Sequence, residues 1–147
     1  MMTVVAVVSD HAGFALKTTV KDWLQSHGYD VRDLGPDSAD SVDYPLMGDR
    51  LAHAMPDAPV GIAICGSGIG ISIALNRHTH IRAALCHDRL SAQLSRQHND
   101  ANVLCLGARL LGEATILDCV DAFLTTEFEG GRHQRRVDQL TNPERKL

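Results

Sequence analysis

The residues best suited to chemistry are Cys65 and the glycine-rich run that follows it. Gly66, Gly68 and Gly70 come directly after an apolar stretch and open a segment with helical spacing. Backbone without side chains can approach an anion closely, and the N–H groups at a helix start can point at it. The same position favours the thiolate form of a neighbouring cysteine. The run therefore predicts an oxyanion or phosphate site beside a reactive thiolate at Cys65.

This loop differs from the common nucleotide-binding motifs, and a simpler explanation for it exists. No Lys-Ser or Lys-Thr pair follows it, as a Walker A motif would need, and Ile71 occupies the third glycine position of the dinucleotide motif. Three glycines could also do no more than form a tight turn between a strand and a helix. The other cysteines form no C-x-x-C pair and are expected to be small buried hydrophobes: Cys86, Cys105 and Cys119.

Two of the eight histidines stand out from the rest. His11 follows Asp10 directly after the first apolar run, and His98 lies in the dense polar run 97–100. His98 could equally be a residue that only completes a helix end. Five of the others fall near helix ends or in polar connections and are expected at the surface: His27, His53, His78, His80 and His87.

Two arginines near the end of the chain could bind a phosphate. Arg132 and Arg136 are four residues apart, so in a helix both guanidinium groups share one face. Two planar donor groups on one face suit the oxygens of a phosphate. A solvated charge run paired with nearby carboxylates is the alternative, and on spacing alone it is the commoner arrangement.

The composition limits what the chain can be. Its 147 residues suit one domain, predicted here over 1–147, and 44% hydrophobic residues allow a buried core. With 14 basic against 18 acidic residues, the net charge of −4 argues against nucleic acid as a partner. There is no basic leader and no run approaching about 18 apolar residues, so we expect no membrane partner and a cytoplasmic protein with reduced thiols. No set of His, Asp and Glu has metal-ligand spacing, so no metal site and no cofactor are predicted.

Short apolar runs alternate with segments of helical spacing, which is typical of an α/β protein with a parallel sheet. The predicted strands are residues 4–8, 29–34, 60–65, 81–85 and 102–106. The predicted helices are residues 14–27, 45–55, 70–77, 89–97, 112–126 and 131–140. The expected fold is a single doubly wound, Rossmann-like, five-stranded parallel sheet with helices on both faces and a C-terminal tail helix. Its ligand would bind outside the carboxyl ends of the strands, where polar and glycine-rich residues follow each strand.

Five blocks of the sequence occur together in the order found in one enzyme family. They are residues 9–13, 43–45, 64–72, 91–103 and 129–136. With these blocks the chain resembles the type B ribose-5-phosphate isomerases over nearly its whole length. The resemblance implies an aldose-ketose isomerase that interconverts ribose 5-phosphate and ribulose 5-phosphate through an enediolate, in the pentose phosphate pathway of carbohydrate metabolism. Such a reaction needs one base that carries a proton and donors aimed at the developing oxyanion.

The resemblance also implies roles for individual residues. Cys65 matches the family's base, and His98 matches the residue that helps to open the sugar ring. The loop that stabilises the enediolate is matched by Ser67 and the amides around Gly66, Gly68 and Gly70. The remaining matches are substrate contacts: Asp10 and Tyr44 beside the ring, Asn99 at a hydroxyl, and His11, Arg109, Arg132 and Arg136 at the phosphate.

Departures from the family pattern and related substrates leave alternatives open. Ser67 stands where many cysteine-using members have Thr, which keeps the hydroxyl, and Ile71 stands where another branch has a glutamate base. Galactose 6-phosphate and allose 6-phosphate are alternative substrates within the same fold, although the run 97–100 argues against the first. A non-catalytic phosphate-binding module is the alternative from another functional class.

The position of His98 predicts that the site is shared between two chains. Cys65 ends the third strand on the carboxyl edge of the sheet, and the helix predicted over 89–97 starts at that same edge. At 1.5 Å per residue, that helix carries the chain about 13 Å toward the opposite edge. His98 would then be beyond hydrogen-bond reach of Cys65 in its own chain. We expect a homodimer with composite sites, and pairing of dimers into a tetramer is left open.

Overall fold

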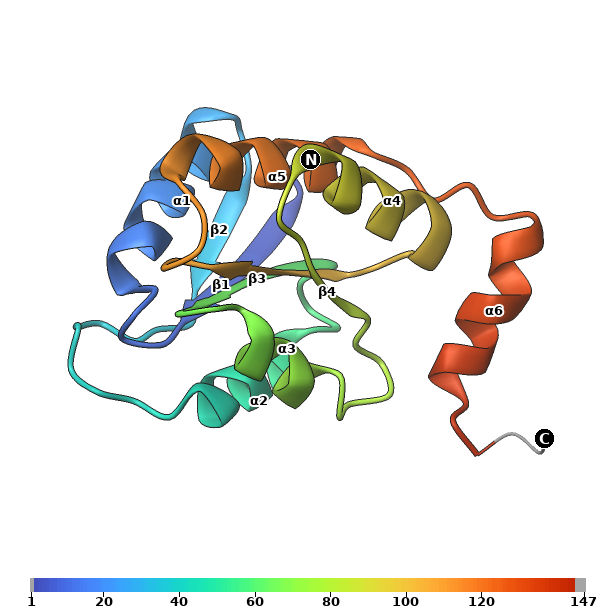
Figure 1. Ribbon diagram of the computed structural model, residues 1–147, viewed down its shortest axis with the longest axis horizontal. Helices are drawn as coiled ribbons and strands as arrows, with labels where there is room; N and C mark the ends of the chain where they lie inside the picture. The colour runs from blue at the N-terminus through green and yellow to red at the C-terminus, as the bar shows by residue number, and fades with distance from the viewer. Residues whose placement is uncertain (1, 145–147) are drawn as a thin grey trace.

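The computed structural model describes residues 2–144, and its centre is a five-stranded parallel sheet (Figure 1). The order across the sheet is β2-β1-β3-β5-β4, and every neighbouring pair is parallel. The strands are β1 (Val4–Ser9), β2 (Asp30–Asp33), β3 (Val60–Cys65), β4 (Ala83–Leu85) and β5 (Val103–Gly107). The three central strands are almost entirely buried. Burial on both faces is the reason that they are continuous apolar runs in the sequence.

Helices cover both faces of the sheet (Figure 1). One face carries α1 (Phe14–Ser26), α4 (Arg89–Asn99) and α5 (Glu113–Thr125), and the other carries α2 (Tyr44–Ala54) and α3 (Ile69–Leu75). Alternate side chains of each central strand enter the two resulting hydrophobic clusters. This two-sided burial fixes the register of the sheet, because a one-residue slip would move every side chain to the opposite layer.

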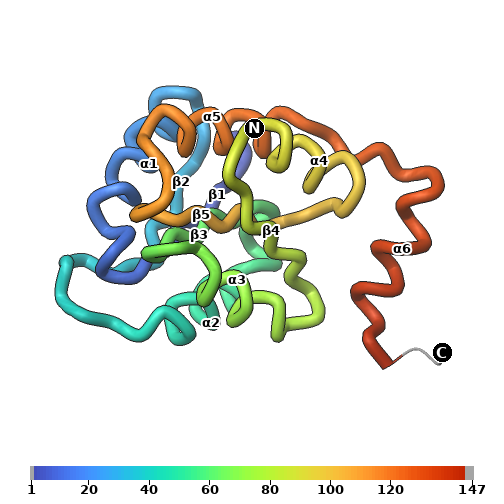
Figure 2. Tube along the Cα trace, in the orientation of Figure 1, coloured from blue at the N-terminus to red at the C-terminus, as the bar shows by residue number. Residues whose placement is uncertain are grey.

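The last helix, α6 (Arg132–Thr141), stands apart from the sheet and packs against α4. Figure 2 shows the chain leaving α5, passing α4 and then turning into α6 at the edge of the molecule. The amide of Glu129 donates to the Gln97 carbonyl at 3.0 Å, which ties this connection to the end of α4. Within residues 2–144, no helix is both long and apolar enough to cross a membrane.

The predicted fold class is confirmed, whereas several predicted element ends are wrong. β4 begins at Ala83 and not at residue 81, because the Arg82 amide donates to the Asn102 side chain at 2.7 Å instead of to a neighbouring strand. α4 continues through His98 to Asn99, where Asp100 takes a left-handed conformation with a φ of 47° and ends the helix. Residues 1 and 145–147 of the predicted domain lie outside the described residues.

The strand order places a crevice at the carboxyl end of the sheet. From β1 the chain crosses to β2 on one side, and β3 then lies on the other side of β1. The connections after β1 and β3 therefore diverge, and the carboxyl ends of these two strands border an open site.

Candidate active site

Cys65 is the last residue of β3, and its thiol is held by the loop that follows. The Gly68 amide donates to Cys65 Sγ at 3.1 Å, and only 4% of the cysteine is exposed. Gly68 has a φ of 78°, and a Cβ there would lie 2.6 Å from Leu85 Cδ1 and 2.9 Å from the Leu106 carbonyl carbon. Only glycine fits this turn, which brings the amide onto the sulfur.

A pocket of about 570 Å³ opens beside this thiol. It is bordered by the ends of β1, β3 and β5 and by the starts of α2 and α3. Its lining is Asp10, Tyr44, Cys65, Gly66, Ser67, Ile69, Gly70, Ile73, Arg109 and Leu110. Most of the residues predicted around the reacting carbons are thus brought together. They meet because the carboxyl ends of parallel strands share one edge of the sheet.

Two glycines of the loop make room for larger pocket residues. A Cβ on Gly70 would lie 2.4 Å from Tyr44 Cε1, and a Cβ on Gly66 would lie 3.3 Å from Arg109 Nη1. The Arg109 amide also donates to the Gly66 carbonyl at 2.9 Å. The guanidinium group therefore rests on the loop and adds a positive charge to a pocket that also contains the Ser67 hydroxyl.

Asp10 borders the pocket from the end of β1, and His11 follows it in the turn after that strand. Asp10 is 7% exposed, and its Oδ1 accepts from the Gly13 amide at 3.1 Å. His11 Nδ1 accepts from the Val42 amide at 3.2 Å, although His11 is not among the residues that line the pocket. This hydrogen bond links the turn after β1 to the chain segment that precedes α2.

The other predicted contacts lie elsewhere in the chain. His98 and Asn99 end α4, and Arg132 and Arg136 are exposed on α6. None of the four lines the pocket around Cys65. Figure 1 shows α4 running from the carboxyl side of the sheet toward α6. The structure thus separates the predicted site into two groups of residues, as the length of α4 predicts for one chain.

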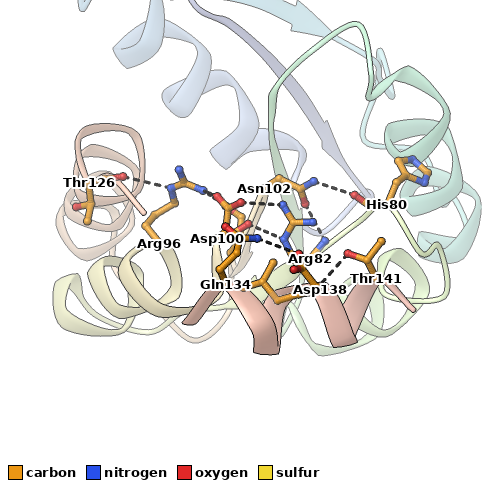
Figure 3. Close-up of polar contacts among 11 residues, drawn as sticks. His80, Arg82, Arg96, Asp100, Asn102, Thr126, Gln134, Asp138 and Thr141 are labelled. Carbon is orange, nitrogen blue, oxygen red and sulfur yellow. Dashed lines mark hydrogen bonds and ion pairs between the residues drawn. The ribbon is translucent and has the colours of Figure 1, made fainter. Parts of the chain in front are cut away.

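A polar network fixes the end of α4 that carries His98 (Figure 3). Asp100 pairs with Arg82 at 3.3 Å and with Arg96 at 3.2 Å. Asn102 accepts from the Arg82 amide at 2.7 Å and donates to the His80 carbonyl at 2.9 Å. These contacts connect the end of α4 to the start of β4, so His98 has a defined position on the protein.

His98 belongs to a cluster that the sequence did not reveal. Its ring stacks on the His133 ring with centroids 4.4 Å apart. Glu129 Oε1 lies 3.8 Å from His98 Nε2 and 3.6 Å from His133 Nε2. Burial lowers the pKa of His133, the neighbouring His98 and Arg132 lower it further, and Glu129 opposes them. Glu129 precedes α6, so helix periodicity does not relate it to His133, and the cluster forms only through the fold of the connection before α6.

The structure brings together one candidate metal-ligand set that the sequence does not predict. The ligand atoms of His98, Glu129 and His133 all lie within 4.8 Å of one another and could hold a metal ion. However, the two ring planes are only 13° from parallel in a stacked arrangement. An imidazole binds a metal in the plane of its ring, so at least one ring must rotate before both nitrogens can converge on an ion.

The remaining cysteines and histidines largely follow the predictions. Cys86, Cys105 and Cys119 are buried free thiols. Burial raises the pKa of all three, and that of Cys119 reaches about 12. Of the five histidines expected at the surface, only His78 is partly buried, with its Nε2 2.8 Å from Asp49 Oδ1.

Comparison with known proteins gives a consistent picture. Residues 5–140 match the family model described as Ribose/Galactose Isomerase. The chain is 46% identical over 142 residues to ribose-5-phosphate isomerase B of Escherichia coli, covering 95% of each chain. It superimposes on a ribose-5-phosphate isomerase B structure from Clostridium thermocellum with a TM-score of 0.95 and 45% identity, covering 97% of both chains. The structure of the type B ribose 5-phosphate isomerase of Trypanosoma brucei superimposes with a TM-score of 0.94 and 40% identity. The match covers 98% of this chain and 100% of the other.

Proposed function

Since this chain belongs to the ribose/galactose isomerase family, we propose that it interconverts ribose 5-phosphate and ribulose 5-phosphate through an enediolate, with Cys65 as the base. The predicted family is confirmed, and with it the prediction of an isomerase. The observation that carries the finer proposal is the 3.1 Å hydrogen bond from the Gly68 amide to Cys65 Sγ, at the edge of a pocket that also holds Ser67 and Arg109.

The proposed chemistry is a proton transfer between two neighbouring carbons. The Cys65 thiolate removes the proton from C2 of the open-chain aldose, the electron pair of that bond forms a C1=C2 double bond, and the π pair of the carbonyl moves onto its oxygen. The enediolate that forms is stabilised by the Ser67 hydroxyl and by loop amides. Cys65 then returns its proton to C1, the proton on O2 moves to O1, and the ketose results with the thiolate restored.

We assign the ring-opening and phosphate contacts to two chains. Asp10, His11 and Arg109 lie with Cys65, whereas His98, Asn99, Arg132 and Arg136 would come from a second copy. A groove of about 670 Å³ between α6, β4 and α4 supports association, since Leu94 and Leu140 line it and remain 37% and 53% exposed. Exposed apolar side chains in such a groove favour contact with another protein surface. A homodimer with two composite sites would account for the division of the contact residues into two groups and for the exposed apolar groove.

An assay with five-carbon and six-carbon substrates side by side tests the substrate. We expect kcat/KM for ribose 5-phosphate to exceed that for allose 6-phosphate and for galactose 6-phosphate. A higher value for either six-carbon sugar phosphate would replace the proposed substrate while leaving the same proton transfer. Turnover of any of these three substrates would distinguish an enzyme from a site that only binds sugar phosphates.

Thiol modification separates the enzyme from a non-catalytic phosphate-binding module. We expect iodoacetamide to label Cys65 and abolish turnover, and ribose 5-phosphate to protect against both. Labelling confined to Cys86, Cys105 or Cys119 would contradict the site. We also propose a reducing, cytoplasmic setting for the protein, which the four buried free thiols support.

A further inference from the structure

His11 makes a hydrogen bond that determines where its proton resides. The Val42 amide donates to His11 Nδ1 at 3.2 Å. A backbone amide can only donate, so Nδ1 must carry a lone pair. A neutral imidazole has one protonated nitrogen, and here that nitrogen is Nε2. A doubly protonated ring would place an N–H against the Val42 N–H and lose the bond.

Val42 belongs to the connection between β2 and α2, and the start of this connection is fixed by Lys17. Lys17 Nζ donates to Asp33 Oδ1 at 2.7 Å and to the Pro36 carbonyl at 2.6 Å. The Gly35 amide donates to the same carboxylate at 2.8 Å. The connection is therefore held at one end by a lysine of α1, and at the other end it leads into α2, whose first residue borders the pocket.

Lys17 is a buried charge that the proposed proton transfer does not use. It is 1% exposed, and its ammonium group lies 5.4 Å from the centre of the Phe14 ring. Burying a cation is costly unless it is paired and hydrogen-bonded. Its amide donates to the Gly13 carbonyl at 2.8 Å, so Lys17 lies one helical turn from the tight turn that contains His11. Lys17 thus ties the start of the connection to α1, and near its end the Val42 amide binds His11.

We propose that residues 34–43, anchored by Lys17, position His11 as the neutral Nε2–H tautomer. His11 then presents an N–H donor to an anionic oxygen of the substrate, while the arginines supply the positive charge. Lys17 and Val42 are positioning residues, because they act through His11. The identity of the acceptor as a sugar phosphate depends on the proposed function, whereas the tautomer does not.

Nitrogen NMR of protein labelled with ¹⁵N in histidine tests the tautomer directly. His11 signals are identified by their absence in His11→Gln. We expect the wild-type protein near neutral pH to show a bare Nδ1 and a protonated Nε2. A proton on Nδ1, on either a neutral or a doubly protonated ring, would overturn the proposal, and this measurement needs no turnover.

Variants test the two positioning residues. Val42→Pro removes the amide proton, whereas the matched control Val42→Ala keeps it. We expect mixed tautomers in Val42→Pro and Lys17→Met and a wild-type pattern in Val42→Ala. For ribose 5-phosphate, KM should rise about tenfold in the first two, as expected for about 1.4 kcal/mol, with kcat nearly unchanged.

The outcomes separate this inference from the proposed function. An unchanged tautomer and KM in folded Val42→Pro and Lys17→Met would contradict the positioning role. If the proline variant does not fold, Lys17→Met still tests the positioning role and the wild-type spectrum still tests the tautomer. The expected tautomer in a protein without activity on ribose 5-phosphate would support the positioning of His11 and overturn the substrate instead.

Discussion

The Gly68 amide lies 3.1 Å from Cys65 Sγ, so a backbone donor faces this thiol. A hydrogen bond donated to sulfur stabilises the thiolate. Cys86 Sγ lies 3.8 Å from the Ala84 carbonyl, and hydrogen bonds from Ser95 and Ser91 do not offset the burial that raises the pKa of this thiol. Burial also raises the pKa of Cys86, Cys105 and Cys119. These differences support the proposal that Cys65, among the four cysteines, is the base.

Replacing Cys65 by Ala should lower the isomerisation rate by roughly 10²- to 10⁴-fold, because a general base contributes in the transition state. Binding of ribose 5-phosphate should be nearly unchanged, since the loop amides and arginines remain. A coupled assay and calorimetric titration measure the two quantities, and thermal unfolding checks the fold. Cys86→Ala is the matched control. A Cys65→Ala rate within about tenfold of wild type would contradict the assignment.

Removal of divalent metals should leave activity intact, because amides, a hydroxyl and guanidinium groups carry the proposed stabilisation. The measurement is the isomerisation rate after prolonged EDTA treatment and gel filtration. Loss of activity that one divalent cation restores would contradict this expectation. His98, Glu129 and His133 would then be the first residues to test, and Glu129→Gln should abolish the restoration.

Replacement of Arg132 or Arg136 by Ala should raise KM for ribose 5-phosphate by about tenfold or more, as expected for one charge-assisted hydrogen bond. The effect on a sugar without phosphate should be much smaller, because the guanidinium group has no anion to bind. Arg135→Ala, on the same exposed helix, is the control. Equal losses on both substrates would point to a folding defect instead.

Acid stability should depend on Asp33. Burial raises its pKa, but hydrogen bonds from Lys17, Lys21 and the Gly35 amide outweigh that effect, so the pKa falls below its ordinary value of 3.8. A lowered pKa in the folded state stabilises the protein above about pH 4, and this contribution is lost as the pH falls through the folded value.

Asp33→Asn should therefore lower the free energy of unfolding by roughly 1–3 kcal/mol at pH 7, in the range of charged hydrogen bonds. The difference from wild type should shrink toward pH 3. Urea unfolding at several pH values measures it, with the exposed Asp30→Asn of the same strand as control. A difference that does not change with pH would mean that the charge of Asp33 is unimportant.

Much of the fold could be predicted because local and global signals agree. The apolar runs of β1, β3 and β5 are long enough to require burial on both faces, and Gly28 follows α1 with a φ of 85°. Most of the residues that line the pocket around Cys65 could be predicted as well, since they follow a strand or begin the next helix, whereas Ile73 lies within α3. The prediction of strand ends failed where a side chain takes the place of strand pairing, as where the Arg82 amide donates to the Asn102 side chain.

The predicted contacts at the end of α4 and on α6 show what a sequence pattern cannot provide. His133 was not predicted as the partner of His98, because stacking of their rings depends on how α6 packs against α4. No spacing rule relates residues so far apart in the chain. The bond from the Val42 amide to His11 has the same origin, since it joins residues that are 31 positions apart in the chain.

The separation of Cys65 and His98 leads to a test of the shared site. Cys65 ends β3, whereas His98 lies at the far end of α4 and contacts Glu129 and His133. If both act on one sugar, His98 must come from a second chain across a two-fold interface. Cys65→Ala and His98→Ala should each be nearly inactive as homodimers, because every site in either homodimer lacks one of the two groups.

A mixed dimer of these two variants would contain one site with both groups intact and one site with neither. Refolding an equal mixture should make half of the dimers mixed, so about a quarter of wild-type activity should return if association is random. Native mass spectrometry measures the fraction of mixed dimers, and refolding each variant alone is the control. If mixed dimers form and activity stays at the level of the parents, then His98 does not complete the partner's site. Loss of the dimer itself in His98→Ala would be seen in the same spectra, and His98→Asn would then replace it in the mixture.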